Sequence, residues 1–202
     1  MARVRTAVLI SGRGSNLGSL IEAARAPDYP AQIVLVISNR GEAGGLAIAA
    51  QAEIPAKVIA YKEFASREEF DAAIDAALRE ADVSVVCEAG FMRIHSEWFV
   101  KRWEGRILNI HPSLLPAFPG VRAHEQALAA GVKISGCTVH FLTAELDSGP
   151  IIAQASVPVL PGDTAETLAA RVLEQEHKLY PAALKLVAEG KVSLENDRAV
   201  FG

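Results

Sequence analysis

The chain has 202 residues, of which 50% are hydrophobic and 22% charged, and its formal net charge is -4. This composition is typical of a folded globular domain and excludes a disordered chain. The negative net charge argues against a protein that tracks nucleic-acid phosphates. It remains compatible with a small anionic substrate, which backbone amides can hold.

The first half of the chain alternates short β-branched runs with amphipathic segments. Because several of the runs are apolar throughout, they are expected to be buried on both faces of a parallel sheet. Leu17, Leu20 and Ile21 repeat at helical spacing, and Ser66 with Glu69 predicts a capped helix start. Strand and helix in this rhythm indicate βαβ units. The expected strands are 4–10, 33–37, 57–60 and 83–87.

The second half changes character after an expected strand at 106–110. Two longer runs, 134–142 and 150–157, are separated by too few residues for a helical crossover, so they are expected to pair antiparallel. Asp163 with Glu166 predicts the start of a last long helix, which Pro181 should kink. Without repeats, low-complexity tracts or linkers, the whole chain, 1–202, is expected to form one domain.

The sequence lacks the features of a disulfide framework, of a metal site and of a secreted or membrane protein. Cys87 and Cys137 are too few for a disulfide framework or a zinc site, and no two histidines have metal-ligand spacing. No metal is therefore expected. No signal region and no run of about 18 apolar residues occurs, so a cytoplasmic protein is expected.

A glycine-rich segment, residues 11–16, follows the first expected strand and opens the first helix. Free amides at a helix start favour an anion such as phosphate. The signal is weak alone, since it lacks the dinucleotide fingerprint and the P-loop lysine. A tight turn with Ser15 as the helix N-cap explains the segment equally well.

Asn109 and His111 lie two apart at the end of an expected strand, so their side chains share one side. Open α/β folds bind ligands at this sheet edge, and an amide beside an imidazole suits an oxygen that gains negative charge. Asp147 lies in the turn between the last two strands. Near His111 it would stabilise the imidazolium, but as an ordinary turn residue it needs no such role. His140 is interpreted as a satisfied buried histidine, and Glu176 with His177 as a solvated pair.

Six segments together resemble the folate-dependent formyltransferases, and the first and last narrow the resemblance to the phosphoribosylglycinamide formyltransferases of purine synthesis. The similarity spans nearly the whole chain. The segments are Ser-Gly-Arg-Gly-Ser-Asn at 11–16, Ala-Gly-Phe-Met-Arg-Ile at 89–94, Asn-Ile-His-Pro-Ser-Leu-Leu-Pro at 109–116, Gly-Cys-Thr-Val-His at 136–140, Leu-Asp-Ser-Gly-Pro at 146–150 and Gln-Glu-His at 175–177.

The resemblance implies an α/β fold with a Rossmann-like, open, mixed but mostly parallel seven-stranded sheet and helices on both faces. It implies 10-formyltetrahydrofolate as co-substrate and the amine of glycinamide ribonucleotide as acceptor, without a metal. Residues 1–100 would form a phosphate-binding half and 101–202 a catalytic and folate-binding half. The implied partners are small molecules, not nucleic acid or membrane, and the implied state is a monomer or homodimer.

The resemblance also assigns roles residue by residue. Asn109, His111 and Asp147 would be catalytic. The remaining residues would bind substrates: Gly14, Ser15 and Asn16 the phosphate, Glu176 the ribose, and Arg67, Met92, Arg93, Ile94, His95 and Asn109 the folate. Two positions depart from the expected pattern, because Glu88 and His95 stand where such enzymes are expected to have apolar residues. Glu88 is expected at a strand end facing solvent.

Three alternatives stay open. A formyltetrahydrofolate hydrolase would carry an added N-terminal domain and a methionyl-tRNA formyltransferase an added C-terminal one. Neither is expected here, since the first strand begins near residue 4 and little follows the last helix. A non-catalytic sugar-phosphate-binding module would explain the glycine segment, but not the combination of Asn109, His111 and Asp147.

Overall fold

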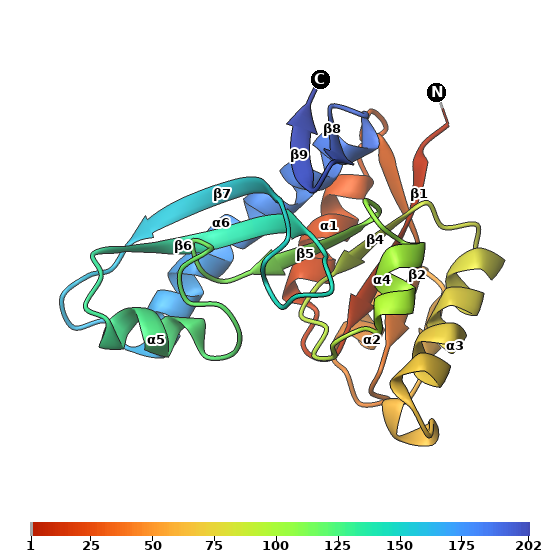
Figure 1. Ribbon diagram of the computed structural model, residues 1–202, viewed down its shortest axis with the longest axis horizontal. Helices are drawn as coiled ribbons and strands as arrows, with labels where there is room; N and C mark the ends of the chain where they lie inside the picture. The colour runs from red at the N-terminus through yellow and green to blue at the C-terminus, as the bar shows by residue number, and fades with distance from the viewer. Residues whose placement is uncertain (1) are drawn as a thin grey trace.

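A seven-stranded sheet forms the centre of the protein (Figure 1), whose computed structural model describes residues 2–202. The strand order is β3-β2-β1-β4-β5-β6-β7. The first five strands run parallel, whereas β6 is antiparallel to both β5 and β7. The expected mixed, mostly parallel sheet is therefore confirmed. The strands are β1 Val4–Ile10, β2 Ala31–Ser38, β3 Ala56–Val58, β4 Val85–Glu88, β5 Ile107–His111, β6 Ile134–Phe141 and β7 Ile151–Pro158.

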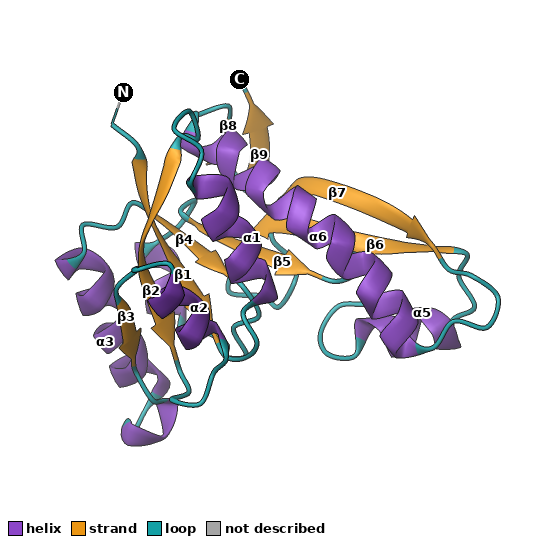
Figure 2. Ribbon diagram, turned by 180° about the vertical axis from the view of Figure 1, so that it is seen from behind, coloured by secondary structure: helices purple, strands orange, loops and turns teal. Residues whose placement is uncertain are grey.

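Helices cover both faces of this sheet, α1, α2 and α6 on one and α3 and α4 on the other (Figures 1 and 2). Strand β1 explains the continuous apolar runs of the sequence. Val8 and Ile10 belong to one buried cluster, and Ala7 and Leu9 to the cluster on the opposite face. The helices are α1 Ser15–Ala24, α2 Gly45–Gln51, α3 Arg67–Glu80, α4 Glu97–Arg102, α5 Ala123–Ala129 and α6 Ala165–Ala188, with a 3-10 turn at Tyr61–Glu63.

The start of α6 differs from the sequence prediction. Thr164, not Asp163, is the N-cap, and its hydroxyl accepts from the backbone N–H of Thr167. Asp163 lies one residue earlier and pairs with Arg171 at 2.7 Å, which explains why an acidic residue stands there. The helix is continuous through Pro181. Ser66 caps α3 as predicted.

A hairpin that the sequence analysis missed follows α6. Strands β8 Val192–Glu195 and β9 Arg198–Phe201 pair antiparallel around Asn196 and Asp197, both of which have positive φ. Two such residues between short strands are a hairpin signal that was present in the sequence. Among residues 2–202, no helix combines the length and the apolar character that crossing a membrane requires.

Candidate active site

The polar residues at the carboxyl end of β5 face the antiparallel strand β6. In the register of this pair, Asn109 lies opposite His140 and His111 lies opposite Thr138. The hydroxyl of Thr138 donates to the carbonyl of Ser113 at 2.7 Å and thereby holds the loop that leaves β5. Strand β6 therefore supports both candidate catalytic side chains of β5.

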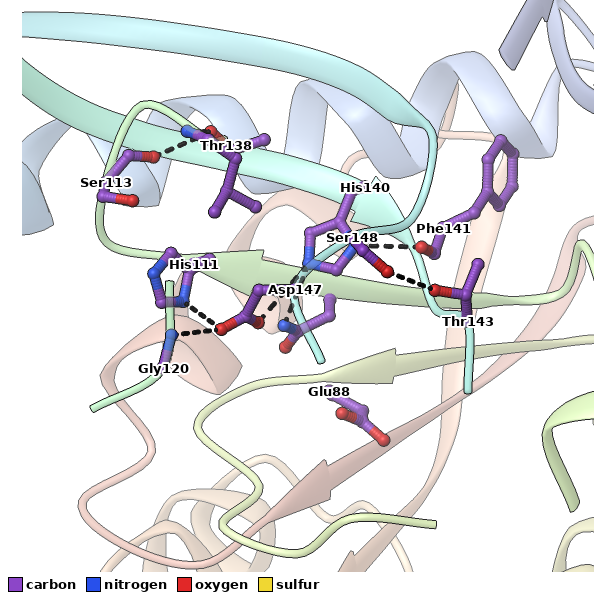
Figure 3. A network of polar contacts seen from close by, with 12 residues as sticks. Glu88, His111, Ser113, Gly120, Thr138, His140, Phe141, Thr143, Asp147 and Ser148 are labelled. Atoms are coloured by element: carbon purple, nitrogen blue, oxygen red, sulfur yellow. Dashed lines mark hydrogen bonds and ion pairs between the residues drawn. The ribbon is translucent and has the colours of Figure 1, made fainter. Parts of the chain in front are cut away.

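The structure brings His111 and Asp147 together, which the sequence alone could not establish (Figure 3). His111 Nδ1 lies 3.3 Å from Asp147 Oδ2, and both side chains are buried. On the other side of the ring, Nε2 lies 2.9 Å from the carbonyl oxygen of Phe118. Both ring nitrogens therefore face acceptors, and an imidazolium ring can donate to the two at once.

Asp147 is held by its turn as well as by its side chain. Its φ is 50°, in the left-handed region where Asp and Asn are the most tolerated residues after glycine. The carboxylate also accepts a 2.7 Å hydrogen bond from the backbone N–H of Gly120. Asp147 therefore joins the turn between β6 and β7 to the loop that precedes α5.

His140 orients the amide of Asn109. The Asn109 nitrogen Nδ2 lies 3.2 Å from Nε2 of His140, whose Nδ1 is 2.9 Å from the carbonyl oxygen of Phe141. Burial lowers the pKa of His140, although the Phe141 carbonyl and Asp147 act in the opposite direction. A neutral ring that donates from Nδ1 has an acceptor at Nε2, so Asn109 donates to it.

His140 is thus more than the satisfied core residue inferred from the sequence. Its ring leaves the second N–H of Asn109 Nδ2 available for another acceptor. The contact between His140 and Asn109 could have been predicted only from the β5–β6 register, which pairs the two residues. The pattern of apolar residues does not specify that register.

The glycine-rich segment forms the turn between β1 and α1. Gly14, not Ser15, is the N-cap of α1, and it adopts a φ of 79°. A side chain at Gly14 would also place its Cβ 2.6 Å from the Cα of Gly45. Ser15 is the first helical residue, so the alternative in which Ser15 is the N-cap is wrong. The first amides of α1 therefore have no side-chain cap, and free amides at a helix start favour an anion.

Asn16 and Glu176 connect α1 with α6. Asn16 Nδ2 donates to Glu176 Oε2 at 2.8 Å, and both residues are buried. The interpretation of Glu176 as part of a solvated pair is therefore wrong. Burial raises the pKa of Glu176, whereas the Asn16 hydrogen bond and the charge of His111 lower it.

The segment of residues 92–95 connects β4 with α4, and its side chains divide between two environments. Met92 and Ile94 are exposed, whereas His95 is buried. The guanidinium of Arg93 lies over the ring of Tyr61, 3.9 Å from its centroid.

Arg67 and Ser11 differ in how they relate to this segment. Arg67 is exposed at the start of α3, and no hydrogen bond among residues 2–202 joins it to the segment. The hydroxyl of Ser11 accepts from the N–H of Met92 at 2.8 Å. The glycine-rich turn and the segment 92–95 therefore lie side by side.

Glu88 does not face solvent as the sequence analysis expected. It stands at the end of β4 but is buried, with only 4% of its surface exposed. Its Oε1 lies 2.8 Å from Nε2 of His95, the second residue that departs from the expected pattern. The two departures are therefore one interacting pair.

An amide, an imidazole and a carboxylate at the carboxyl edge of an open α/β sheet form a site suited to acyl transfer. The sequence pattern of the formyl transferase family matches residues 4–184, and the chain belongs to this family. It is 44% identical to the phosphoribosylglycinamide formyltransferase of Haemophilus influenzae, over 96% of this chain and 92% of that protein. Within the family, the chain therefore groups with the phosphoribosylglycinamide formyltransferases.

Two further relatives agree with this placement. The crystal structure of the phosphoribosylglycinamide formyltransferase from Brucella melitensis is 57% identical, with a TM-score of 0.89 over 92% of this chain and 96% of that one. The trifunctional purine biosynthetic protein adenosine-3 of Homo sapiens is 55% identical over 95% of this chain. The chain spans only 19% of that larger protein.

Proposed function

We propose that the chain transfers the formyl group of 10-formyltetrahydrofolate to the amine of glycinamide ribonucleotide. The products are formylglycinamide ribonucleotide and tetrahydrofolate. The observation that carries the proposal is the arrangement of Asn109 and His111 on one strand, with Asp147 against the His111 ring. The relatives named phosphoribosylglycinamide formyltransferase support the choice of substrates.

The first step is attack of the neutral amine on the formyl carbon, which gives a tetrahedral intermediate with a negatively charged oxygen. Asn109 donates to that oxygen through the N–H that His140 does not use. His111 donates through Nε2, and the formyl oxygen replaces the Phe118 carbonyl as its acceptor. Two fixed donors at an oxyanion lower the barrier because they need no reorientation.

The second step breaks the bond between the formyl carbon and the folate nitrogen. The amine loses a proton and the leaving nitrogen gains one. Asp147 keeps His111 protonated through the 3.3 Å contact, and the pair moves the proton between the two nitrogens. The formyl carbon is already activated on its carrier, so the step needs no metal.

Binding of the acceptor falls to the first half of the chain and to α6. The amides that follow Gly14, at Ser15 and Asn16, would hold the phosphate, and Glu176 the ribose hydroxyls. Glu176 is already held by Asn16, which supports a shared site for the two parts of the nucleotide.

Binding of the folate falls to residues near the end of β4 and the start of α3. Met92, Arg93, Ile94 and Asn109 would contact it, with Arg67 reaching from α3. His95 is buried beneath this segment, so its side chain would contribute to folate binding indirectly. We further propose one domain over 1–202 that acts in the cytoplasm as a monomer or homodimer, on small molecules and not on nucleic acid or membrane.

A formyl-transfer assay tests this proposal against its rivals. Purified protein is given 10-formyltetrahydrofolate with glycinamide ribonucleotide, with water alone, or with charged initiator tRNA. Turnover is expected only with the ribonucleotide, and it should be lost in Asp147→Asn. Release of formate in water alone would instead indicate a hydrolase, and folate binding without transfer to any acceptor would indicate a binding module.

A further inference from the structure

Three ionisable side chains meet beneath the segment 92–95. His95 Nδ1 lies 2.6 Å from Asp71 Oδ1, and His95 Nε2 lies 2.8 Å from Glu88 Oε1. The side chains of the three residues are between 1% and 5% exposed. Because unpaired buried charges are costly, an imidazolium between two carboxylates is the state that this geometry favours.

The same cluster joins three elements of the fold. Asp71 belongs to α3, Glu88 ends β4, and His95 immediately precedes Ser96, the N-cap of α4. The second oxygen of Asp71 accepts from the backbone N–H of Ser96 at 2.6 Å. The backbone around His95 is therefore fixed from two sides.

Aromatic rings close the remaining faces of His95. Its ring stacks on Phe91 at 5.3 Å and on Phe99 at 4.3 Å between centroids. The charged groups that face the imidazole are thus Asp71 from α3 and Glu88 from β4. Burial disfavours the charged ring, but these two carboxylates outweigh it and raise the pKa of His95 to about 9.

The segment 92–95 is consequently held at both ends while its middle stays exposed. Met92 is anchored at its N–H by Ser11, and His95 is anchored at its ring by Asp71 and Glu88. Arg93 and Ile94, between these anchors, are exposed. A ligand that contacts the middle of the segment meets a backbone whose shape the two anchors set.

We propose that Glu88 and His95 are positioning residues for the folate co-substrate, which fix the backbone of residues 92–95 through a buried ion pair. They act through that backbone and do not touch the reacting atoms. The inference rests on the proposed function, in which this segment contacts the folate. It also explains why Glu88 occurs together with His95, since without that histidine Glu88 would be a buried carboxylate with no cationic partner.

The test is a double-mutant cycle with Glu88→Leu, His95→Leu and the combined variant. Each single change is expected to raise the KM for 10-formyltetrahydrofolate about tenfold, equivalent to about 1.4 kcal/mol. The kcat and the KM for glycinamide ribonucleotide should stay within about twofold, because the change affects one binding contact only. The combined variant should raise the folate KM no further than His95→Leu alone, because Glu88 acts only through the His95 ring.

Two further variants keep the test informative if a single change prevents folding. Glu88→Gln retains the shape of the side chain and removes its charge, so it should raise the folate KM in the same direction. Glu97→Gln, an exposed position in the first turn of α4, is the matched control and should not change it. Unchanged folate KM in the Glu88 and His95 variants, or equal losses in kcat and in both KM values, would overturn the proposal. So would a combined variant that shows the product of the two single effects.

The pH profile separates positioning by charge from simple packing. In wild type the folate KM should be low below pH 9 and rise above it, as His95 loses its proton and the ion pair is lost. In the combined variant it should stay flat over the same range. A wild type that binds tetrahydrofolate in calorimetry but transfers no formyl group would refute the proposed function. The Kd for tetrahydrofolate in the same variants would still decide the role of Glu88 and His95.

Discussion

Asn109 and His140 face one another across the β5–β6 pair, with 3.2 Å between the Asn109 amide nitrogen and Nε2 of His140. The Nδ1–H of His140 donates to the carbonyl of Phe141, so Nε2 of the same ring is an acceptor. The Asn109 amide therefore points its nitrogen, and not its oxygen, toward the ring. The amide of Asn109 is therefore oriented before any substrate binds.

Asn109→Ala is expected to lower kcat by roughly 100- to 1,000-fold with the melting temperature nearly unchanged, as for the loss of one oxyanion donor. Steady-state kinetics and thermal denaturation measure the two quantities. A variant within about threefold of wild type would remove Asn109 from the mechanism.

His140→Phe should lower kcat about tenfold, because the ring volume is kept while the acceptor for Asn109 is lost. In the Asn109→Ala background the same change should cost almost nothing further, since the group that it orients is gone. Multiplying losses in the double variant would mean that His140 acts independently of Asn109.

Asp147→Asn and Asp147→Ala should separate charge from backbone conformation. Asn tolerates the φ of 50° and can still accept from Gly120, so its melting temperature should match wild type while kcat falls by roughly 100- to 10,000-fold. Ala should lose comparable activity and also melt about 2–8 °C lower, because the left-handed conformation costs it about 1–2 kcal/mol. Equal melting temperatures for the two variants would contradict this reading of the turn.

Gly14→Ala should destabilise the protein and raise the KM for glycinamide ribonucleotide at least about tenfold. The new Cβ would meet Gly45 at 2.6 Å and the φ of 79° is strained for alanine, so the first amides of α1 must shift. Gly18→Ala is the control within the same helix, because no atom lies within 4 Å of its added Cβ. That change should leave the KM unaltered and preserve or raise the melting temperature, since alanine is the better helix former.

Glu176→Gln should stabilise the protein at neutral pH while weakening substrate binding. The pKa of Glu176 is raised in the folded state, so its favourable contribution is present below the unfolded pKa and is lost as the pH rises through the folded value. Glutamine stays neutral, so its gain in melting temperature should appear at pH 8 and vanish near pH 4. The KM for glycinamide ribonucleotide should rise in the same variant. A pH-independent difference in melting temperature would show that ionisation of Glu176 is not responsible.

The sheet was predictable because its signal is local. The run from Ala7 to Ile10 is apolar throughout, and a strand covered by helices on both faces requires that pattern. The short separation of the runs that became β6 and β7 likewise left only an antiparallel pairing. The β8–β9 hairpin was missed although Asn196 and Asp197 carried its turn signal.

The residues of the candidate site could be predicted from the sequence, but most of the contacts between them could not. Asp147 is 36 positions beyond His111, and their contact depends on a turn with positive φ and on the loop that contains Gly120. The burial of Glu88 likewise depends on His95 in the loop before α4, and through it on Asp71 of α3. Contacts of this kind arise from packing between distant segments and leave no periodic pattern in the sequence.

The hydroxyl of Ser11, which accepts from the N–H of Met92, lies between the segments proposed to bind the two substrates. A shift of the glycine-rich turn on phosphate binding would be transmitted through this bond to the folate segment. Thermodynamic linkage then requires that each substrate change the affinity for the other by the same factor. The size of any coupling carried by this one hydroxyl group would therefore be the same whichever substrate is titrated first.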